Sequence, residues 1–195
     1  KGTYSIEKSL VIPEGYTFKI EAGVTLNLLN ESLIMSRGKL AWIGTAAEPI
    51  TISSSDDERG QGLVVMETTD RSQLVHVHFN NLSNPDIDDW NLPGSVTFYQ
   101  ADVDMRHVTI NGSNSEDGLN LVRSNFNLDE CTIKNTASDA LDVDFGSGEL
   151  SNSYFSNIGN DAIDISGTEL KLFNIEISNI CDKGISSGEK STIRG

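Results

Sequence analysis

The sequence predicts an all-β parallel solenoid, in which coils of about 22 residues with three short strands each stack along one axis. The first observation is a short phrase that returns every 22 residues: Asp117-Gly118-Leu119-Asn120, Asp139-Ala140-Leu141-Asp142, Asp161-Ala162-Ile163-Asp164 and Lys183-Gly184-Ile185-Ser186. The second is that apolar residues recur at the same interval. The third is that they alternate with polar residues in short runs, which is strand periodicity with one buried face. Residues one interval apart are therefore expected to be spatial neighbours.

The first sixty residues are predicted to be atypical coils that cap the N-terminal end. They contain short β runs at 9–15, 17–20 and 24–28, separated by glycine turns, but the first fifty residues lose the 22-residue register. Terminal repeats of a solenoid commonly differ from the others because they cover an otherwise open core.

Regular coils are predicted from residue 62 to residue 195, with one inserted loop. Residues 95–110 align with residues 118–133 at a shift of 23, so one turn carries an extra residue. Residues 74–82 supply an earlier strand. Between these segments, residues 83–94 contain prolines and paired acids, which disfavour a regular strand, and are expected to form a projecting loop.

Apolar columns and an asparagine column stabilise the regular coils in this interpretation. The apolar columns are Leu128, Leu150 and Leu172; Ile133, Phe155 and Ile177; Leu119, Leu141, Ile163 and Ile185; and Leu121, Val143 and Ile165. Asn135, Asn157 and Asn179 are expected to hydrogen-bond along the stack. Leucine-rich repeats share the period, but they need a denser leucine signature and a helical segment. Residues 191–195 look like the start of a further coil, so we expect a single domain of a larger protein.

Composition narrows the range of partners. The net charge of −15 with scattered basic residues argues against nucleic acid, whose binding needs a basic surface. It also opposes direct binding of an acidic polysaccharide, but not of a neutral one. No run approaches the roughly 18 apolar residues of a membrane span, so membrane insertion is not expected. Cys131 and Cys181 fall in different columns, so we expect two free thiols.

Carboxylates form columns on the regular coils. Asn120, Asp142, Asp164 and Ser186 are expected to point outwards as one column; Val122, Asp144 and Ser166 form the next; Asp117, Asp139, Asp161 and Lys183 stack in the turn. Coils lie about 4.8 Å apart. At that distance two carboxylates repel by roughly 1 to 3 kcal/mol, so the columns need an explanation.

Three interpretations of the carboxylate columns stay open. The turn carboxylates can cap backbone N–H groups. The strand carboxylates can simply be solvated. Alternatively, they hold a hard cation, for which Ca²⁺ is the best candidate because it accepts several oxygen ligands in loose geometry. The candidate metal ligands are Asp142, Asp164, Asp144, Asp139 and Asp161. Oxygen ligands without nearby His or Cys argue against zinc.

Other residues have both a structural and a functional interpretation. Trp90 in the inserted loop can stack on a sugar ring or fix its own loop to the barrel. Asn120 is a further candidate binding residue because it continues the Asp142 column. Arg106 with Asp129 and His107 with Glu130 are expected to be cross-coil ion pairs, and the register suggests that His76 stacks on His107.

Several segments resemble repeats of the pectin-lyase-like superfamily. Segments 11–15, 20–24 and 44–50 are similar to the first coils of many bacterial surface β-helix proteins. Segments 138–144, 159–164 and 182–186 look like repeats in surface proteins that sometimes also carry a spore-coat-H-like kinase module. The resemblance implies a right-handed parallel β-helix and a bacterial protein located outside the cell, at its surface or in the periplasm.

The resemblance also implies candidate activities. Lyases of the superfamily bind Ca²⁺ through carboxylates and use a nearby Arg or Lys as base, and its hydrolases use paired Asp residues. Asp142, Asp144, Asp161 and Asp164 match the acidic part, with Arg123 and Lys183 as the cations nearest to them in the register. We expect a surface module that binds carbohydrate or another surface partner. A polysaccharide lyase or glycoside hydrolase is one alternative, and a purely structural spacer is the other.

Overall fold

The alternation of apolar and polar residues produces three short strands per coil, and equivalent strands of successive coils pair in parallel. The computed structural model describes residues 1–54, 60–87 and 90–195, and these residues form strands and turns without a helix. Accordingly, no helix in these ranges is long and apolar enough to cross a membrane. The predicted all-β parallel solenoid is confirmed.

Three eight-stranded sheets run along the stack. Sheet A contains β1 (Gly2–Ile6), β4 (Val24–Leu28), β7 (Ile50–Ser53), β10 (Val77–Asn80), β15 (Thr109–Asn111), β18 (Thr132–Thr136), β21 (Tyr154–Ile158) and β24 (Glu176–Ile180). Sheet B contains β2 (Leu10–Ile12), β5 (Leu33–Ser36), β8 (Gly62–Met66), β13 (Gly94–Tyr99), β16 (Asp117–Val122), β19 (Asp139–Asp144), β22 (Ile163–Ser166) and β25 (Ile185–Ser187). Sheet C contains β3 (Phe18–Glu21), β6 (Leu40–Ile43), β9 (Ser72–Val75), β14 (Val103–Arg106), β17 (Asn125–Asp129), β20 (Ser147–Ser151), β23 (Glu169–Phe173) and β26 (Thr192–Arg194).

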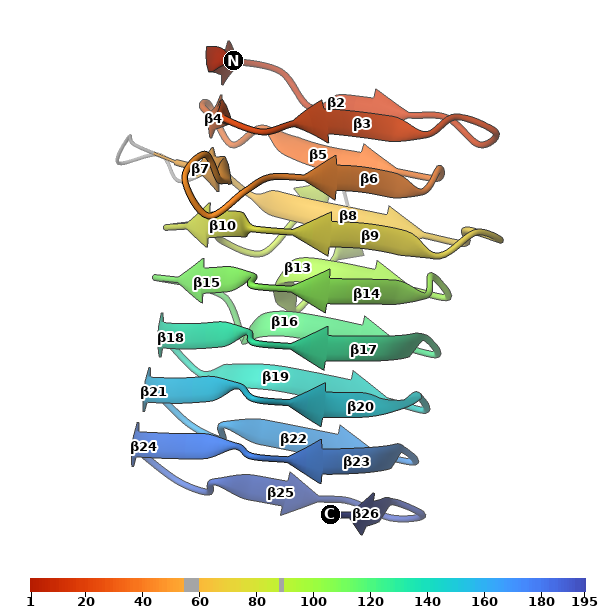
Figure 1. Ribbon diagram of the computed structural model, residues 1–195, viewed down its shortest axis with the longest axis vertical. Coiled ribbons are helices and arrows are strands. Elements are labelled where there is room, and N and C mark those ends of the chain that lie inside the picture. Colours follow the sequence, from red (N-terminus) through yellow and green to blue (C-terminus); the bar gives the residue numbers. More distant parts are fainter. Residues whose placement is uncertain (55–59, 88–89) are drawn as a thin grey trace.

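Figure 1 shows the coils stacked from the N-terminus at the top to the C-terminus at the bottom. The strands of sheet C run to the left in front, those of sheet B run to the right behind, and sheet A closes the left side. The chain therefore descends as a right-handed coil, the hand that parallel crossovers almost always take.

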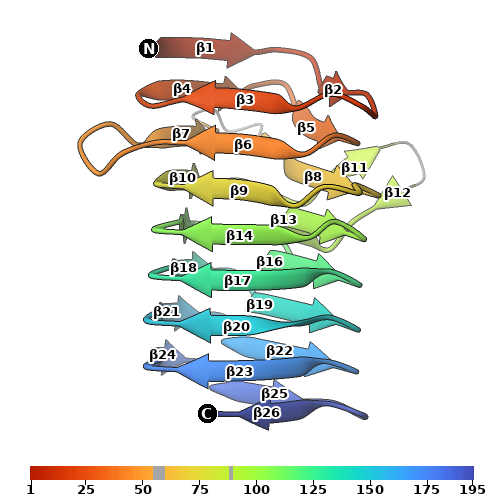
Figure 2. The same ribbon diagram turned by 45° about the vertical axis from the view of Figure 1, so that its right-hand side comes forward.

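The inserted segment contains more structure than the sequence predicts. Instead of a plain loop, β11 (Asp86–Ile87) and β12 (Trp90–Asn91) pair antiparallel as a short hairpin. Figure 2 shows this hairpin projecting from the stack beside β8. A two-residue ladder tolerates the flanking prolines because neither proline lies within it.

The strand register confirms the predicted columns of the regular coils. Leu119 pairs with Leu141 and Leu141 with Ile163, while Val96 pairs with Leu119 at the predicted shift of 23. The predicted loss of the 22-residue step in the first fifty residues is only partly correct for the first coil, because Gly2 pairs with Val24 and Phe18 with Leu40 at a step of 22, whereas Leu10 pairs with Ile34 at a step of 24. The step changes in the next coil, where Thr25 pairs with Thr51.

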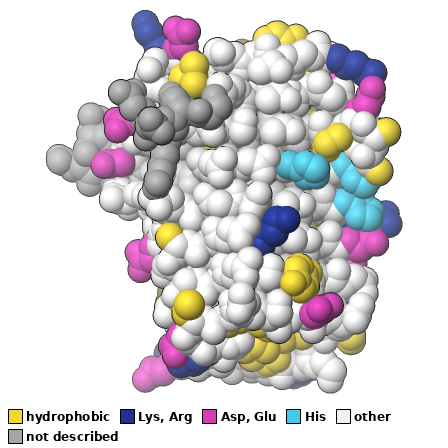
Figure 3. Space-filling view, turned by 90° about the vertical axis from the view of Figure 1, so that its left-hand side faces the viewer, with side chains coloured by type: hydrophobic (Ala, Val, Ile, Leu, Met, Phe, Trp, Pro, Cys, Tyr) yellow, Lys and Arg dark blue, Asp and Glu magenta, His cyan; other side chains and the backbone are white. Residues whose placement is uncertain are grey.

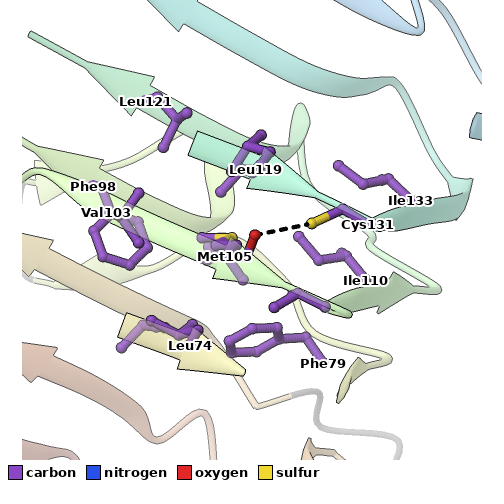
Figure 4. Packing of buried hydrophobic residues seen from close by; sticks show 14 of the residues in the cluster. Leu74, Phe79, Phe98, Val103, Met105, Ile110, Leu119, Leu121, Cys131 and Ile133 are labelled. Atoms are coloured by element: carbon purple, nitrogen blue, oxygen red, sulfur yellow. Dashed lines mark hydrogen bonds between the residues drawn. The ribbon is translucent and has the colours of Figure 1, made fainter. Parts of the chain in front are cut away.

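The inward side chains of all three sheets form one continuous core. Figure 4 shows its middle section, where Phe98, Met105, Leu119 and Ile133 lie between the sheets. Near the N-terminal end Trp42 is fully buried, with Phe18 packed edge-on at a ring distance of 5.5 Å. The buried Cys131 thiol lies 3.8 Å from the Met105 carbonyl oxygen (Figure 4), and Cys131 and Cys181 are free thiols, as predicted.

Asparagines form ladders at two places on the coils. Asn157 donates to Asn135 at 2.9 Å and Asn179 to Asn157 at 2.7 Å, as predicted from their column. A second ladder occupies the tight turn between sheets C and A, where Asn174 donates to Asn152 at 3.0 Å. Both of these turn residues have positive φ, a conformation that Asn tolerates better than most residues. The ladders therefore fix the corners of the coil.

Candidate functional site

Strands β16, β19 and β22 of sheet B bring the predicted site residues together. Asn120 pairs with Asp142, and Asp142 pairs with Asp164, while Asp144 lies beside Val122 and Ser166. Asp142, Asp144 and Asp164 face outwards on these strands because Leu119, Leu141 and Ile163 fill the core. We call the group formed by Asp117, Asn120, Asp142, Asp144 and Asp164 the acidic face.

Asn120 links two carboxyl groups at the upper end of the acidic face. Its side-chain amide donates to Oδ2 of Asp117 at 3.0 Å and to Oδ2 of Asp142 at 3.1 Å. Its own oxygen, Oδ1, is buried and has no hydrogen-bond partner among the described residues. One amide group is therefore shared between two acids, and a buried acceptor is left unsatisfied.

The expectation that Asn120 is exposed on the surface is wrong. Asn120 is 1% exposed and Asp117 2%, although Asp142 and Asp164 are half-buried. The cause is the end of the inserted segment, where the Asp117 N–H donates to the Pro93 carbonyl at 3.0 Å. Gly94 lies so close to Asn120 that an added Cβ would be 2.6 Å from the Asn120 Cβ. The insertion thus removes this end of the column from solvent.

Burial and mutual repulsion raise the pKa values of these acids. Burial raises the pKa of Asp117 to about 8, and the carboxylates of Asp142, Asp139 and Glu116 add to the shift, against the Asn120 hydrogen bond. Burial raises the pKa of Asp142 to about 7, with Asp144, Asp164 and Asp139 as the further causes. The pKa of Asp144 is also raised, by burial and then by Asp164.

No cation compensates this negative charge within the described part of the chain. The ion pairs found there do not include Asp117, Asp142, Asp144 or Asp164. The acidic face is therefore charged or protonated according to pH, because its acids have each other as neighbours instead of bases.

The turn carboxylates Asp139 and Asp161 have the capping role that was one of the three interpretations. Oδ1 of Asp139 accepts the backbone N–H of Asp161 at 2.8 Å, and Oδ1 of Asp161 accepts that of Lys183 at 2.8 Å. Lys183 ends the row with Nζ 3.3 Å from Oδ2 of Asp161. Asp117 does not cap the next coil in this way, because the backbone N–H of Asp139 donates to the Glu116 carbonyl instead of to the Asp117 carboxyl group.

Asp117 is the member of the site that the sequence interpretation missed. It occupies the same column as Asp139 and Asp161, so the repeat assigns it the same cap. The available signal was its position, since Asp117 follows the coil that carries the inserted segment 83–94. An insertion one coil away therefore changes the neighbours of this residue relative to those of Asp139 and Asp161.

The structure brings the strand carboxylates together without forming a metal cage. Asp142, Asp144 and Asp164 share one face, but the described residues contain no group of three or more His, Cys, Asp or Glu side chains arranged to hold a metal ion. Trp90 belongs to β12, but its side chain lies outside the described residues, so its role stays a prediction.

The two cations considered as bases have other neighbours. Lys183 Nζ contacts Asp161 and also Asp182, and the Arg123 guanidinium lies 6.0 Å from the centre of the Phe145 ring. The predicted ion pair of Arg106 with Asp129 is confirmed, with Arg106 Nε 3.8 Å from the carboxylate, and the predicted contact of His107 with Glu130 is present at 3.1 Å from Nε2. The predicted stacking of His76 on His107 is also confirmed, at a ring distance of 4.3 Å.

Comparisons with known proteins give little further information. No protein-family model and no curated protein matches the chain. Among solved structures, the trypsin-treated form of QnrB1, a plasmid-mediated fluoroquinolone resistance protein, aligns at 13% identity over 95% of this chain and 91% of that one. The TM-score is 0.17, which is too low to support a conclusion about fold or function.

Proposed function

We propose that this protein is a β-helix module of a bacterial surface protein, which binds Ca²⁺ on the acidic face and engages carbohydrate there. Its repeats resemble those of the pectin-lyase-like superfamily. The observation that carries the proposal is the raised pKa of Asp142 beside Asp117, Asp144 and Asp164, without a basic partner among the described residues. A hard cation relieves this repulsion and offers free coordination positions to sugar oxygens.

Calcium binding requires side-chain rotation at the acidic face. The carboxylates of Asp142 and Asp164 lie on adjacent strands, about 4.8 Å apart along the stack. Half-buried aspartates on a strand surface can rotate toward a shared ion, and Asp144 can join from the same strand. An acidic glycan, which the net charge of −15 repels, would then bind through the ion.

Calcium titration by calorimetry tests this proposal. We expect one site in the wild type and at least about tenfold weaker binding in Asp142→Asn and Asp164→Asn, because each loses a charged ligand. Glu149→Gln, a half-buried carboxylate on sheet C, is the matched control and should bind like the wild type.

The pH dependence of the titration gives a second readout. Because the pKa of Asp142 is raised to about 7, protons compete with the ion, and binding should be about tenfold tighter at pH 8 than at pH 6. An absence of calcium heat at both pH values would contradict the proposal. Without glycan retention as well, the structural spacer would be the remaining interpretation.

A glycoside hydrolase is the second candidate function, and one observation favours it. An acid with a pKa of about 7 can donate a proton at neutral pH, and Asp142 lies beside other carboxyl groups. Release of reducing ends from a glycan panel, abolished in Asp142→Asn, would support it. The lyase alternative has less support because Lys183 is paired with Asp161 and Asp182.

A further inference from the structure

The outward side chains of sheet A form two columns on a different side of the solenoid from the acidic face. One column contains Thr3, Thr25, Thr51, His78, Thr109, Thr132, Tyr154 and Glu176; the other contains Ser5, Asn27, Ser53, Asn80, Asn111, Lys134, Ser156 and Ser178. We call this surface the hydroxyl face. Neighbours in a column are about 4.8 Å apart, so hydroxyl and amide groups repeat at a regular spacing.

Several hydroxyls of this face have no partner among the residues that the structure describes. In residues 1–54, 60–87 and 90–195, no hydrogen bond involves the side chains of Thr25, Thr51, Thr109 or Thr132, which are all partly exposed. Threonines in the buried turns differ, since the hydroxyl of Thr168 donates to the Ser166 carbonyl at 3.0 Å. The hydroxyl groups of these four threonines are therefore available to a ligand.

The hydroxyl face carries almost no charge, although the chain carries −15. Its two columns contain one basic side chain, Lys134, and one acidic side chain, Glu176. Burial, and then Lys134, lower the pKa of His78, which keeps its imidazole neutral at pH 7. Figure 3 looks onto this side and shows most of it uncoloured, with one basic side chain near the middle, hydrophobic side chains and an acidic one below it, and most other charged groups toward the edges.

These properties restrict the partner. A nucleic acid needs a basic surface, and protein interfaces usually centre on several aromatic, Met or Arg anchors. An ice surface is an alternative occupant of a regular array of hydroxyl groups, and the experiment below distinguishes it. An uncharged polymer with hydroxyl groups at regular intervals matches the face in charge, hydrogen bonding and repeat.

We infer that the hydroxyl face binds the flat surface of an insoluble, uncharged polysaccharide. The coils repeat at about 4.8 Å, so the face offers hydrogen-bonding groups at regular intervals to a polymer whose hydroxyl groups also repeat. Tyr154 adds an aromatic ring at the lower end of the face, with its hydroxyl 3.0 Å from Ser178. This inference does not depend on the acidic face, which belongs to sheet B.

Co-sedimentation with microcrystalline cellulose and with chitin tests the inference. The wild type should be depleted from solution by at least one of these powders. The triple variant Thr51→Val, Thr109→Val and Thr132→Val keeps the β-branched shape and removes three hydroxyls, so its binding should weaken at least about tenfold. The matched control Thr17→Val, Thr69→Val and Thr192→Val changes three exposed threonines elsewhere and should bind like the wild type.

A second variant covers the case in which the methyl groups alone sustain binding or the triple variant fails to fold. Thr109→Glu places a charge at the centre of the face and should prevent retention, whereas Asn127→Glu, exposed on sheet C, should not. Equal retention of Thr109→Glu and Asn127→Glu would overturn the inference, as would no retention of the wild type. Inhibition of ice recrystallisation without polysaccharide binding would also overturn the inference. A loss of retention in Asp142→Asn alone would do the same, because it would place the binding site on the acidic face.

Discussion

Sheets A and B are built on the same coils with the same spacing, yet their outer surfaces have opposite electrostatic character. On sheet B, Asp142 lies between Asn120 and Asp164, and its pKa is raised to about 7. On sheet A, Thr109 lies between His78 and Thr132 and carries no charge. Each coil places its side chains next to the equivalent side chains of the neighbouring coils. Carboxyl groups that repel each other are therefore neighbours on sheet B, and uncharged hydrogen-bonding groups are neighbours on sheet A.

The largest expected effect comes from breaking the core that both surfaces share. Phe98 is fully buried on β13, and Phe98→Ala should lower the free energy of unfolding by about 3 to 5 kcal/mol. Urea denaturation followed by circular dichroism measures this change. The control Phe173→Ala, at a position 49% exposed, should cost far less, and an equal loss in the two variants would contradict the assignment of Phe98 to the core.

A smaller effect should distinguish the acidic face by its pH dependence. The pKa of Asp117 is raised from its ordinary value of 3.8 to about 8 in the folded protein. Its carboxyl group therefore stabilises the folded state fully below about pH 4, and this contribution is lost progressively as the pH rises to about 8. Asp117→Asn keeps an acceptor for the Asn120 amide but does not titrate. Its stability relative to the wild type should therefore increase between pH 5 and pH 9, on the order of 2 to 4 kcal/mol.

Thermal unfolding of both proteins across this pH range measures the difference. The variant Asp70→Asn, in which the exposed partner of Lys39 loses its charge, controls for a general reduction of negative charge. A constant difference between Asp117→Asn and the wild type at all pH values would show that Asp117 is not a protonated, buried acid.

The smallest expected effect concerns the hydroxyl face. Thr109→Val removes a partly exposed hydroxyl without a partner in the described structure, so the free energy of unfolding should change by less than about 0.5 kcal/mol. Chemical denaturation at pH 7 measures it. A loss above about 1 kcal/mol would indicate that the hydroxyl has a structural role, and the contrast between the two surfaces would then be weaker than proposed.

Much of the fold follows from the sequence because strand stacking is local and periodic. The 22-residue interval predicted the pairing of Leu119 with Leu141 and the ladder from Asn135 to Asn179, and the cap that Asp161 provides for Lys183 was one of the interpretations that it left open. Each of these contacts joins equivalent positions of neighbouring coils. A column in the sequence is therefore already a contact in the structure.

The prediction was least successful where the repeat is interrupted. The interval gave no sign that Asn120 is buried or that Asp117 bonds to it instead of capping Asp139, since both follow from the position of Pro93 and Gly94. The hydroxyl face was also missed. Its members in the N-terminal coils are offset by varying steps, such as the 26 residues from Thr25 to Thr51, so the sequence does not show them as one column.

The sequence by itself determined the parallel solenoid, its core columns and the alignment of its carboxylates, because each coil packs mainly against its neighbours. Only the tertiary structure decided which of these side chains water can reach. The insertion buries Asn120, and the neighbours of each carboxyl group decide its charge. Asp117 and Asp161 are both buried members of one column, but Asp161 accepts the Lys183 N–H and lies beside the Lys183 ammonium, whereas Asp117 lies beside other acids and has a raised pKa.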